Sequence, residues 1–294
     1  MAISVFPVFE DFAAEVGDVD LAQPQDEAVI ASVRAAFAQY AVLVFPGQHL
    51  AEADHLRFAQ WFGPLETTIG SFRDHTQLRT SDKIADVSNL DTNEAIWGAD
   101  SRQRMFQLGN RLWHTDSSFR HVPARASALY ARSIAPVGGQ TEFADLRAAF
   151  DALSVERQVA LRPLVARHSI FHSRAKLGFS NFSEAERQAL PEVRQRLVRR
   201  LPEQDRECLY LASHIGGIEG MDDVAAQALV EDLCAHATQR AFRYVHRWRQ
   251  GDLVIWDNRC TMHRATDFED LRWPRDMQRA TVEDVGNTLE VDGS

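Results

Sequence analysis

Two histidines and one aspartate form the most informative set of residues in this chain. His114 and Asp116 stand two residues apart, and His263 follows far downstream. Two imidazoles and one carboxylate can bind one face of an octahedral metal ion and leave the opposite face open, as in non-haem Fe(II) oxygenases. Arg275 lies shortly beyond the second histidine, where a guanidinium could hold a dicarboxylate. These residues indicate an enzyme that uses a metal ion, O2 and a dicarboxylate co-substrate.

The spacing of the first two residues also predicts a geometry. Successive side chains of a strand point to opposite faces, so His114 and Asp116 should point the same way and Thr115 away from them. A His-x-Asp pair is common by chance, and most of the 11 histidines are expected to be ordinary surface or core residues. The distant His263 and the arginine beyond it are what favour a metal site.

Composition limits the classes of protein to which the chain could belong. The net charge is −10 and no long basic run occurs, which argues against nucleic acid as a partner but not against a small anion. No apolar run approaches the roughly 20 residues that span a bilayer, and no signal peptide is recognisable at the N-terminus. The three cysteines have no CxxC spacing and are expected to be reduced. We therefore expect a cytoplasmic globular protein that binds neither membrane nor nucleic acid.

The elements that must position these residues follow from periodicity and from turn residues. No repeat or linker interrupts the chain, so we expect a single domain over residues 1–294. The predicted helices cover residues 26–40, 51–62, 146–153 and 222–236, and the predicted strands cover 41–45, 127–131 and 141–143. Residues 242–248 and 253–256 read as a β-hairpin around a turn at 250–251.

The arrangement of these elements predicts the fold. His263 lies just beyond a strand, and two ligand groups on separate strand ends can meet at the mouth of a jelly roll. We expect an α+β, mainly β fold whose core is a double-stranded β-helix (jelly roll) flanked by helices. The segment 66–109 is polar and aperiodic, which favours a mobile lid over the active site.

Several motifs, in a fixed order, carry a resemblance to a known family. They are Phe62–Glu66, Asp86–Asn89, Leu112–Phe119, Gly138–Phe143, Asp145–Leu153, Gly251–Cys260 and His263–Ala265. Together they resemble the TauD/TfdA family of Fe(II)- and 2-oxoglutarate-dependent dioxygenases over about residues 19–285. Within the family the chain is most similar to the branch that acts on 2,4-dichlorophenoxyacetate and other phenoxyalkanoates.

The resemblance implies roles for the residues that match the family's motifs. His114, Asp116 and His263 match the ligands of Fe(II). Thr141 and Arg275 match the positions that bind the distal carboxylate of 2-oxoglutarate. A guanidinium pairs two-pronged with a carboxylate and keeps its charge, and a hydroxyl adds one further donor.

Other positions are implied to contact the substrate. Arg279 matches an arginine that lies near both the co-substrate and the substrate anion, and His214 matches a position that holds the substrate carboxylate. Asn89 and Ile69 are expected to line the same pocket as His214. The segment that follows Ile69 lacks a lysine that related sequences can carry, so the resemblance leaves the identity of the substrate open.

The activity implied by the resemblance is a hydroxylation that uses O2. The carbon α to the carboxylate of an aryloxyalkanoate would be hydroxylated, giving a phenol, glyoxylate, succinate and CO2. The implied partner is a small anionic aromatic molecule, and a homo-oligomer is expected. Three alternatives remain open: the same machinery acting on a sulfonate or alkyl sulfate, a zinc hydrolase with the same ligands, and a non-catalytic binding protein of cupin type.

Overall fold

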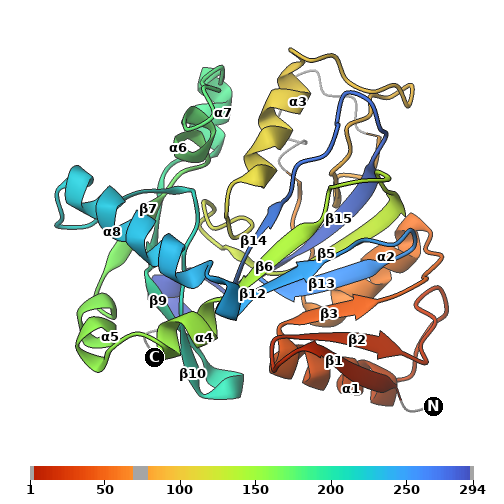
Figure 1. Cartoon of the computed structure of the whole chain (residues 1–294), viewed down its shortest axis with the longest axis horizontal. Coiled ribbons are helices and arrows are strands. Elements are labelled where there is room, and N and C mark those ends of the chain that lie inside the picture. Colours follow the sequence, from red (N-terminus) through yellow and green to blue (C-terminus); the bar gives the residue numbers. More distant parts are fainter. Residues whose placement is uncertain (1–2, 69–78, 292–294) are drawn as a thin grey trace.

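A seven-stranded sheet is the largest element of the computed structural model, which describes residues 3–68 and 79–291. Its strand order is β1-β2-β3-β13-β5-β15-β4, and it fills the right half of Figure 1. The strands are β1 (Ser4–Phe9), β2 (Ala13–Gly17), β3 (Val42–Phe45), β4 (Ile84–Asp86), β5 (Ala124–Ser133), β13 (Leu253–Asp257) and β15 (Asp276–Glu283). Only β2 and β3 pair in parallel; the other pairs in this sheet are antiparallel.

Three smaller sheets complete the β structure of the described residues, with the strand orders β12-β6-β14, β11-β7-β8 and β10-β9. Their strands are β6 (Thr141–Asp145), β7 (Val165–His168), β8 (Val193–Arg196), β9 (Val198–Leu201), β10 (Arg206–Leu209), β11 (Ile215–Ile218), β12 (Arg243–His246) and β14 (Thr261–Ala265). The sheet β12-β6-β14 shares one hydrophobic core with the inner face of the large sheet. The two opposed sheets form the predicted jelly roll.

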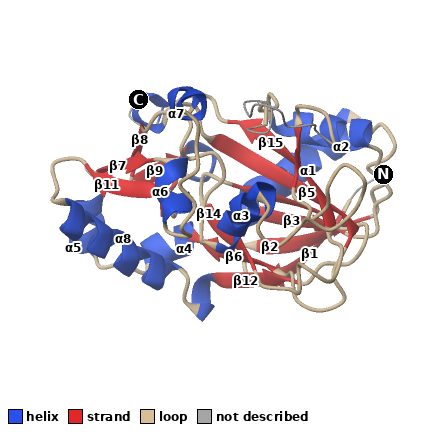
Figure 2. Cartoon of the chain, turned by 90° about the horizontal axis from the view of Figure 1, so that it is seen from above, coloured by secondary structure: helices blue, strands red, loops and turns tan. Residues whose placement is uncertain are grey.

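Helices surround this β core. They are α1 (Glu27–Tyr40), α2 (Glu52–Ala59), α3 (Arg102–Gln107), α4 (Leu146–Asp151), α5 (Val155–Leu161), α6 (Ile170–Ala175), α7 (Glu184–Ala189), α8 (Asp223–Ala237) and α9 (Thr288–Val291). Short 3-10 turns η1 (Gln60–Phe62), η3 (Leu108–Arg111), η4 (Pro202–Gln204) and η5 (Arg240–Phe242) extend or connect them. Helices α1 and α2 lie at the end of the molecule opposite to α5 and α8 (Figures 1 and 2).

The central strands of the large sheet are apolar throughout because their side chains alternate between two hydrophobic cores, one on each face of the sheet. In β3, Val42 and Val44 face the inner core, whereas Leu43 and Phe45 face the core beneath α1 and α2. In β13 the inner residues are Val254 and Trp256, and the alternate residues face outward. Because both faces of the sheet are covered, these strands are continuous apolar runs. No helix in residues 3–68 or 79–291 is long and apolar enough to cross a bilayer.

The structure confirms most of the elements predicted from the sequence and corrects one. The helices and strands expected over residues 26–62, 127–153 and 222–236 are present, with ends shifted by a few residues. The hairpin predicted from residues 242–248 and 253–256 is wrong, because β12 pairs with β6 while β13 pairs with β3 and β5. Gly251, with φ of 84°, carries the chain from one sheet to the other. Alternation and a turn show that two strands follow each other, but not that they pair.

The described part of the segment 66–109 contains β4, α3 and the start of η3. It is therefore partly regular, and its mobility stays a prediction.

Candidate metal centre

A single pair of backbone hydrogen bonds brings the two histidines together. His114 forms an isolated antiparallel bridge with His263 of β14, with N–H to O distances of 3.0 and 2.8 Å. The centroids of the two imidazole rings lie 4.2 Å apart. Asp116 lies between their Nε2 atoms, each of which is 3.6 Å from one of its carboxylate oxygens. One potential ligand atom from each residue lies within 4.8 Å of the others, and all three residues are buried. The structure therefore places the three predicted ligands at one point.

The local backbone differs from the predicted strand but keeps its alternation. Only His114 makes a bridge, and the chain turns at Asp116. The Thr115 hydroxyl points the other way and donates to Leu211 O at 2.9 Å. The two ligands thus share one side, as the spacing predicts.

The hydrogen bonds and charges at these residues suit a divalent cation. The Nδ1 atom of His114 lies 2.7 Å from Leu112 O and must donate to it, which leaves the lone pair of Nε2 directed at the centre. Burial, followed by the neighbouring His114, holds the pKa of His263 well below its ordinary value. Burial alone would raise the pKa of Asp116, but Arg279 and the two imidazoles hold it well below its usual range. Two imidazoles and one carboxylate form a donor set that fits Fe(II).

A cavity beside this centre, lined by described residues, contains a buried cation. His114, His263, Thr141 and Arg275 all line it. The guanidinium of Arg275 makes no hydrogen bond or ion pair with any residue that the structure describes, and burial lowers its pKa to about 10. It therefore remains charged near neutral pH. A buried charge without a counterion is costly, so the cavity is built to receive an anion.

Strand β15 places the second arginine on the same inner face. Within β15, residues 277 and 279 share one face, and Met277 belongs to the inner core; Arg275 directly precedes the strand. The guanidinium of Arg279 donates to Asp116 Oδ1 and lines both cavities. In this structure Arg279 therefore contacts a metal ligand directly, between the positions expected for co-substrate and substrate.

The second cavity is larger, with a volume of about 390 Å3. His114, Asp116 and His214 line it on the side of the metal centre, and its walls include apolar and aromatic side chains. These are Ile84, Leu90, Trp97, Phe106, Phe119 and Ile170. Such a cavity can accept an apolar ring, with the polar groups at the end nearest to the metal.

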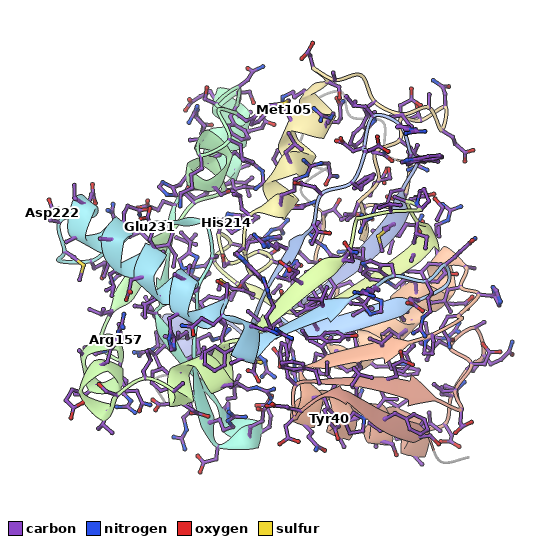
Figure 3. The ribbon with its side chains drawn as sticks, in the orientation of Figure 1. Tyr40, Met105, Arg157, His214, Asp222 and Glu231 are labelled. Carbon is purple, nitrogen blue, oxygen red and sulfur yellow. The ribbon has the colours of Figure 1, made fainter. Side chains whose placement is uncertain are left out.

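His214 lies at that polar end. Figure 3 shows it near the middle of the molecule, between α8 and the strands of the large sheet. Its Nδ1 is 2.9 Å from the Ser173 hydroxyl, which itself donates to Ile170 O, so the imidazole must be the donor. Burial, followed by the nearby Arg174, lowers the pKa of His214 well below its ordinary value. In the neutral ring Nε2 is then an acceptor, and the positive charge for an anionic ligand comes from Arg174 and Arg279, which line the same cavity.

Asn89 occupies a different place from the one expected from the sequence. It lines the cavity of Arg275 and not that of His214. Its amide nitrogen donates to Asp270 O and Trp273 O, and its amide oxygen accepts from the backbone N–H of Arg275 at 2.8 Å. The side chain thus braces the turn that presents Arg275. Ile69, also expected in the substrate pocket, lies outside the described residues.

Sequence reasoning missed the contacts that close the Arg275 cavity. Arg104 of α3 forms an ion pair with Asp270 at 2.8 Å, and Arg111 forms one with Asp267 at 3.0 Å. These pairs join α3 and η3 to the turn that Asn89 braces. It also missed Arg174, because a single arginine on a short helix has no signal in the sequence that distinguishes it from a surface residue.

Comparisons with known proteins agree with this geometry. The sequence matches the family described as taurine catabolism dioxygenase TauD, TfdA family over residues 4–281. It is 38% identical to an alpha-ketoglutarate-dependent 2,4-dichlorophenoxyacetate dioxygenase of Cupriavidus pinatubonensis, with 97% of this chain and 99% of the relative covered. It is 34% identical to an (S)-phenoxypropionate/alpha-ketoglutarate-dioxygenase of Sphingobium herbicidovorans, with 91% of each covered. The crystal structure of AAD-2 in complex with Mn(II) and N-oxalylglycine superposes with a TM-score of 0.90 at 42% identity, covering 98% of this chain and 99% of that one.

Proposed function

The chain belongs to the TauD, TfdA family of dioxygenases, and from this premise we propose that it hydroxylates an aryloxyalkanoate such as 2,4-dichlorophenoxyacetate. The protein is a 2-oxoglutarate-dependent dioxygenase that uses Fe(II) and O2. The observation that carries the substrate proposal is the position of the metal centre between two cavities. One cavity contains the buried cation Arg275, and the other combines aromatic walls with polar groups around His214.

The proposed reaction balances with one molecule each of O2, 2-oxoglutarate and substrate. When Fe(II) is bound by the two histidines and the aspartate, it supplies the redox chemistry that reduces O2 at the expense of 2-oxoglutarate and a substrate C–H bond. One oxygen atom ends in succinate, which forms with loss of CO2, and the other becomes a hydroxyl on the carbon between the ether oxygen and the carboxylate. The resulting hemiacetal breaks its bond to the aryl oxygen and gives a phenol and, from an acetate, glyoxylate.

The chain's own residues contribute orientation. Arg275 and the Thr141 hydroxyl would bind the far carboxylate of 2-oxoglutarate, because both line the first cavity and both can donate to an acceptor. In the second cavity, Arg279 and Arg174 would hold the substrate carboxylate beside His214, with the ring against Phe119 and Ile170. Fixing two reactants next to one metal replaces random encounters with a single geometry, which is a large part of catalysis.

The test is consumption of O2 by the Fe(II)-loaded protein with 2-oxoglutarate and a panel of candidate substrates. An aryloxyalkanoate should stimulate O2 uptake and release its phenol in a 1:1 ratio with succinate. If only sulfonates or alkyl sulfates stimulate uptake, with release of sulfite or sulfate, the substrate proposal is wrong. Hydrolysis without O2 uptake would contradict the dioxygenase chemistry itself.

We also propose a homo-oligomer in the cytoplasm. Phe6 and Val8 are exposed on β1, an edge strand of the large sheet, where apolar side chains favour association. The three cysteines are free, which suits a reducing compartment. Light scattering of the purified protein would measure the oligomeric state, and a monomeric mass would contradict the first of these proposals.

A further inference from the structure

One hydrogen bond links the Arg275 cavity to the strand behind it. The indole Nε1–H of Trp248 donates to the hydroxyl oxygen of Thr141, with a distance of 3.0 Å between the two atoms. Trp248 follows β12 and is buried, with 9% of its surface exposed. An indole N–H can only donate, whereas a hydroxyl can donate once and accept. The direction of this bond is therefore fixed.

That direction determines where the hydroxyl hydrogen of Thr141 can point. Because Thr141 Oγ1 accepts from Trp248, its own hydrogen must point elsewhere. Among residues 3–68 and 79–291 no acceptor for it is found, and Thr141 lines the cavity that contains Arg275. We infer that Trp248 is a positioning residue that presents the Thr141 hydroxyl as a donor to the distal carboxylate of 2-oxoglutarate. This inference rests on the proposed function.

The surroundings of Trp248 hold its indole in place. The ring of His246 meets it edge to face, with centroids 4.6 Å apart and an interplanar angle of 90°. His246 is held in turn by the buried carboxylate of Asp252 at 3.1 Å and by the Tyr244 hydroxyl at 3.2 Å. In the pairing of β12 with β6, His246 lies opposite Thr141. The backbone pairing of β12 with β6 and the hydrogen bond from Trp248 to Thr141 therefore hold the same two segments together.

The arrangement has a consequence for selectivity. Because Trp248 donates to the oxygen of Thr141, the O–H of Thr141 is left to donate to a ligand in the cavity, and the guanidinium of Arg275 offers only donors. A carboxylate, which only accepts, satisfies both residues. A co-substrate that ends in a methyl group satisfies neither, so the contribution of Trp248 should depend on the presence of the distal carboxylate.

The experiment compares two ligands in the Mn(II)-loaded protein by calorimetry. N-oxalylglycine has a distal carboxylate, and N-methyloxamate lacks that carboxylate and ends in the N-methyl group. Trp248→Phe keeps an aromatic ring and removes the N–H. We expect this substitution to weaken the binding of N-oxalylglycine about five- to tenfold, which is the contribution of one hydrogen bond. The affinity for N-methyloxamate should change less than twofold. Trp61→Phe, a partly buried tryptophan beside α2 on the other side of the large sheet, is the control and should change neither affinity.

A double-mutant cycle tests whether Trp248 acts through Thr141. In a Thr141→Val background, Trp248→Phe should produce no further loss of affinity for N-oxalylglycine. Additive losses, an equal loss for both ligands, or an unchanged affinity of Trp248→Phe for N-oxalylglycine would overturn the inference. If the wild-type metal-loaded protein binds neither N-oxalylglycine nor 2-oxoglutarate, the proposed function fails instead.

A second measurement applies even if Trp248→Phe does not fold. The wild-type protein has six tryptophans, whose indole N–H signals can be followed by NMR after 15N labelling. Thr141→Val removes the acceptor and should shift one indole signal upfield and speed its exchange with solvent. Six unchanged indole signals in a folded Thr141→Val variant would overturn the inference.

Discussion

The buried charge of Arg275 should lower the free energy of unfolding of the protein when no anion is bound. Burial lowers the pKa of its guanidinium from the ordinary value to about 10, and no described carboxylate pairs with it. A lowering of this size corresponds to roughly 3 kcal/mol of unfavourable free energy for the charged form. Because the unfolded chain binds the proton more tightly, this cost is fully present below pH 10 and disappears only as the pH rises above 10. Near neutral pH the folded protein therefore carries the whole penalty.

Arg275→Met removes the charge and keeps most of the side-chain volume. We expect the ligand-free variant to be more stable than the wild type by about 1 to 3 kcal/mol, since some of the gain is offset by imperfect packing. The same variant should bind 2-oxoglutarate at least a hundredfold more weakly, because a two-pronged charged pair is lost. Urea unfolding without ligand measures the first effect. The increase in melting temperature of the metal-loaded protein on addition of 2-oxoglutarate measures the second.

If Arg275 binds an anion, Arg275→Met must increase the stability of the ligand-free protein and decrease its affinity for 2-oxoglutarate. A ligand-free Arg275→Met variant that is less stable than the wild type by more than 1 kcal/mol would indicate that the guanidinium is a structural group. An unchanged response to 2-oxoglutarate would have the same meaning. Thr141→Val is the matched comparison, because it removes a neutral donor from the same cavity and should weaken binding without stabilising the ligand-free protein.

Three further predictions concern other parts of the molecule. Asp116→Ala should abolish succinate formation and metal binding, and appreciable turnover by a folded, iron-loaded variant would contradict the metal centre. Burial lowers the pKa of His55 to about 4 and that of His168 to about 3, so the unfolded chain takes up more protons as the pH falls below 6.5. Urea unfolding should show a loss of about 2 kcal/mol per histidine between pH 7 and pH 5, and His55→Gln should reduce that loss. A Cβ on Gly109 would lie 2.1 Å from the guanidinium of Arg174, so Gly109→Ala should raise the KM for the aryloxyalkanoate at least fivefold. The KM for 2-oxoglutarate should stay the same, and equal changes in both constants would show a general distortion.

The sequence was sufficient to predict those features of the fold and the site that depend on neighbouring residues. The His-x-Asp spacing predicts that both ligands share a side, and the apolar runs of β3 and β13 predict strands that are covered on both faces. It was insufficient where a contact joins distant segments. Gly251 predicts a turn between β12 and β13, but it does not show that β12 pairs with β6 and β13 with β5, which are distant in sequence. The amide of Asn89 braces a turn almost 200 residues away in sequence, which no local pattern encodes.

The formal charges around the metal centre suggest why both of its organic ligands are acids. Asp116 is negative, His214 and His263 are held neutral by burial, and three arginines, Arg174, Arg275 and Arg279, line the two cavities. A divalent cation bound by His114, Asp116 and His263 would add two further positive charges. The two carboxylates of 2-oxoglutarate and the single carboxylate of an aryloxyalkanoate offset this positive charge. Since unbalanced buried charge is costly, an uncharged analogue with the shape of the substrate should bind less well than the acid.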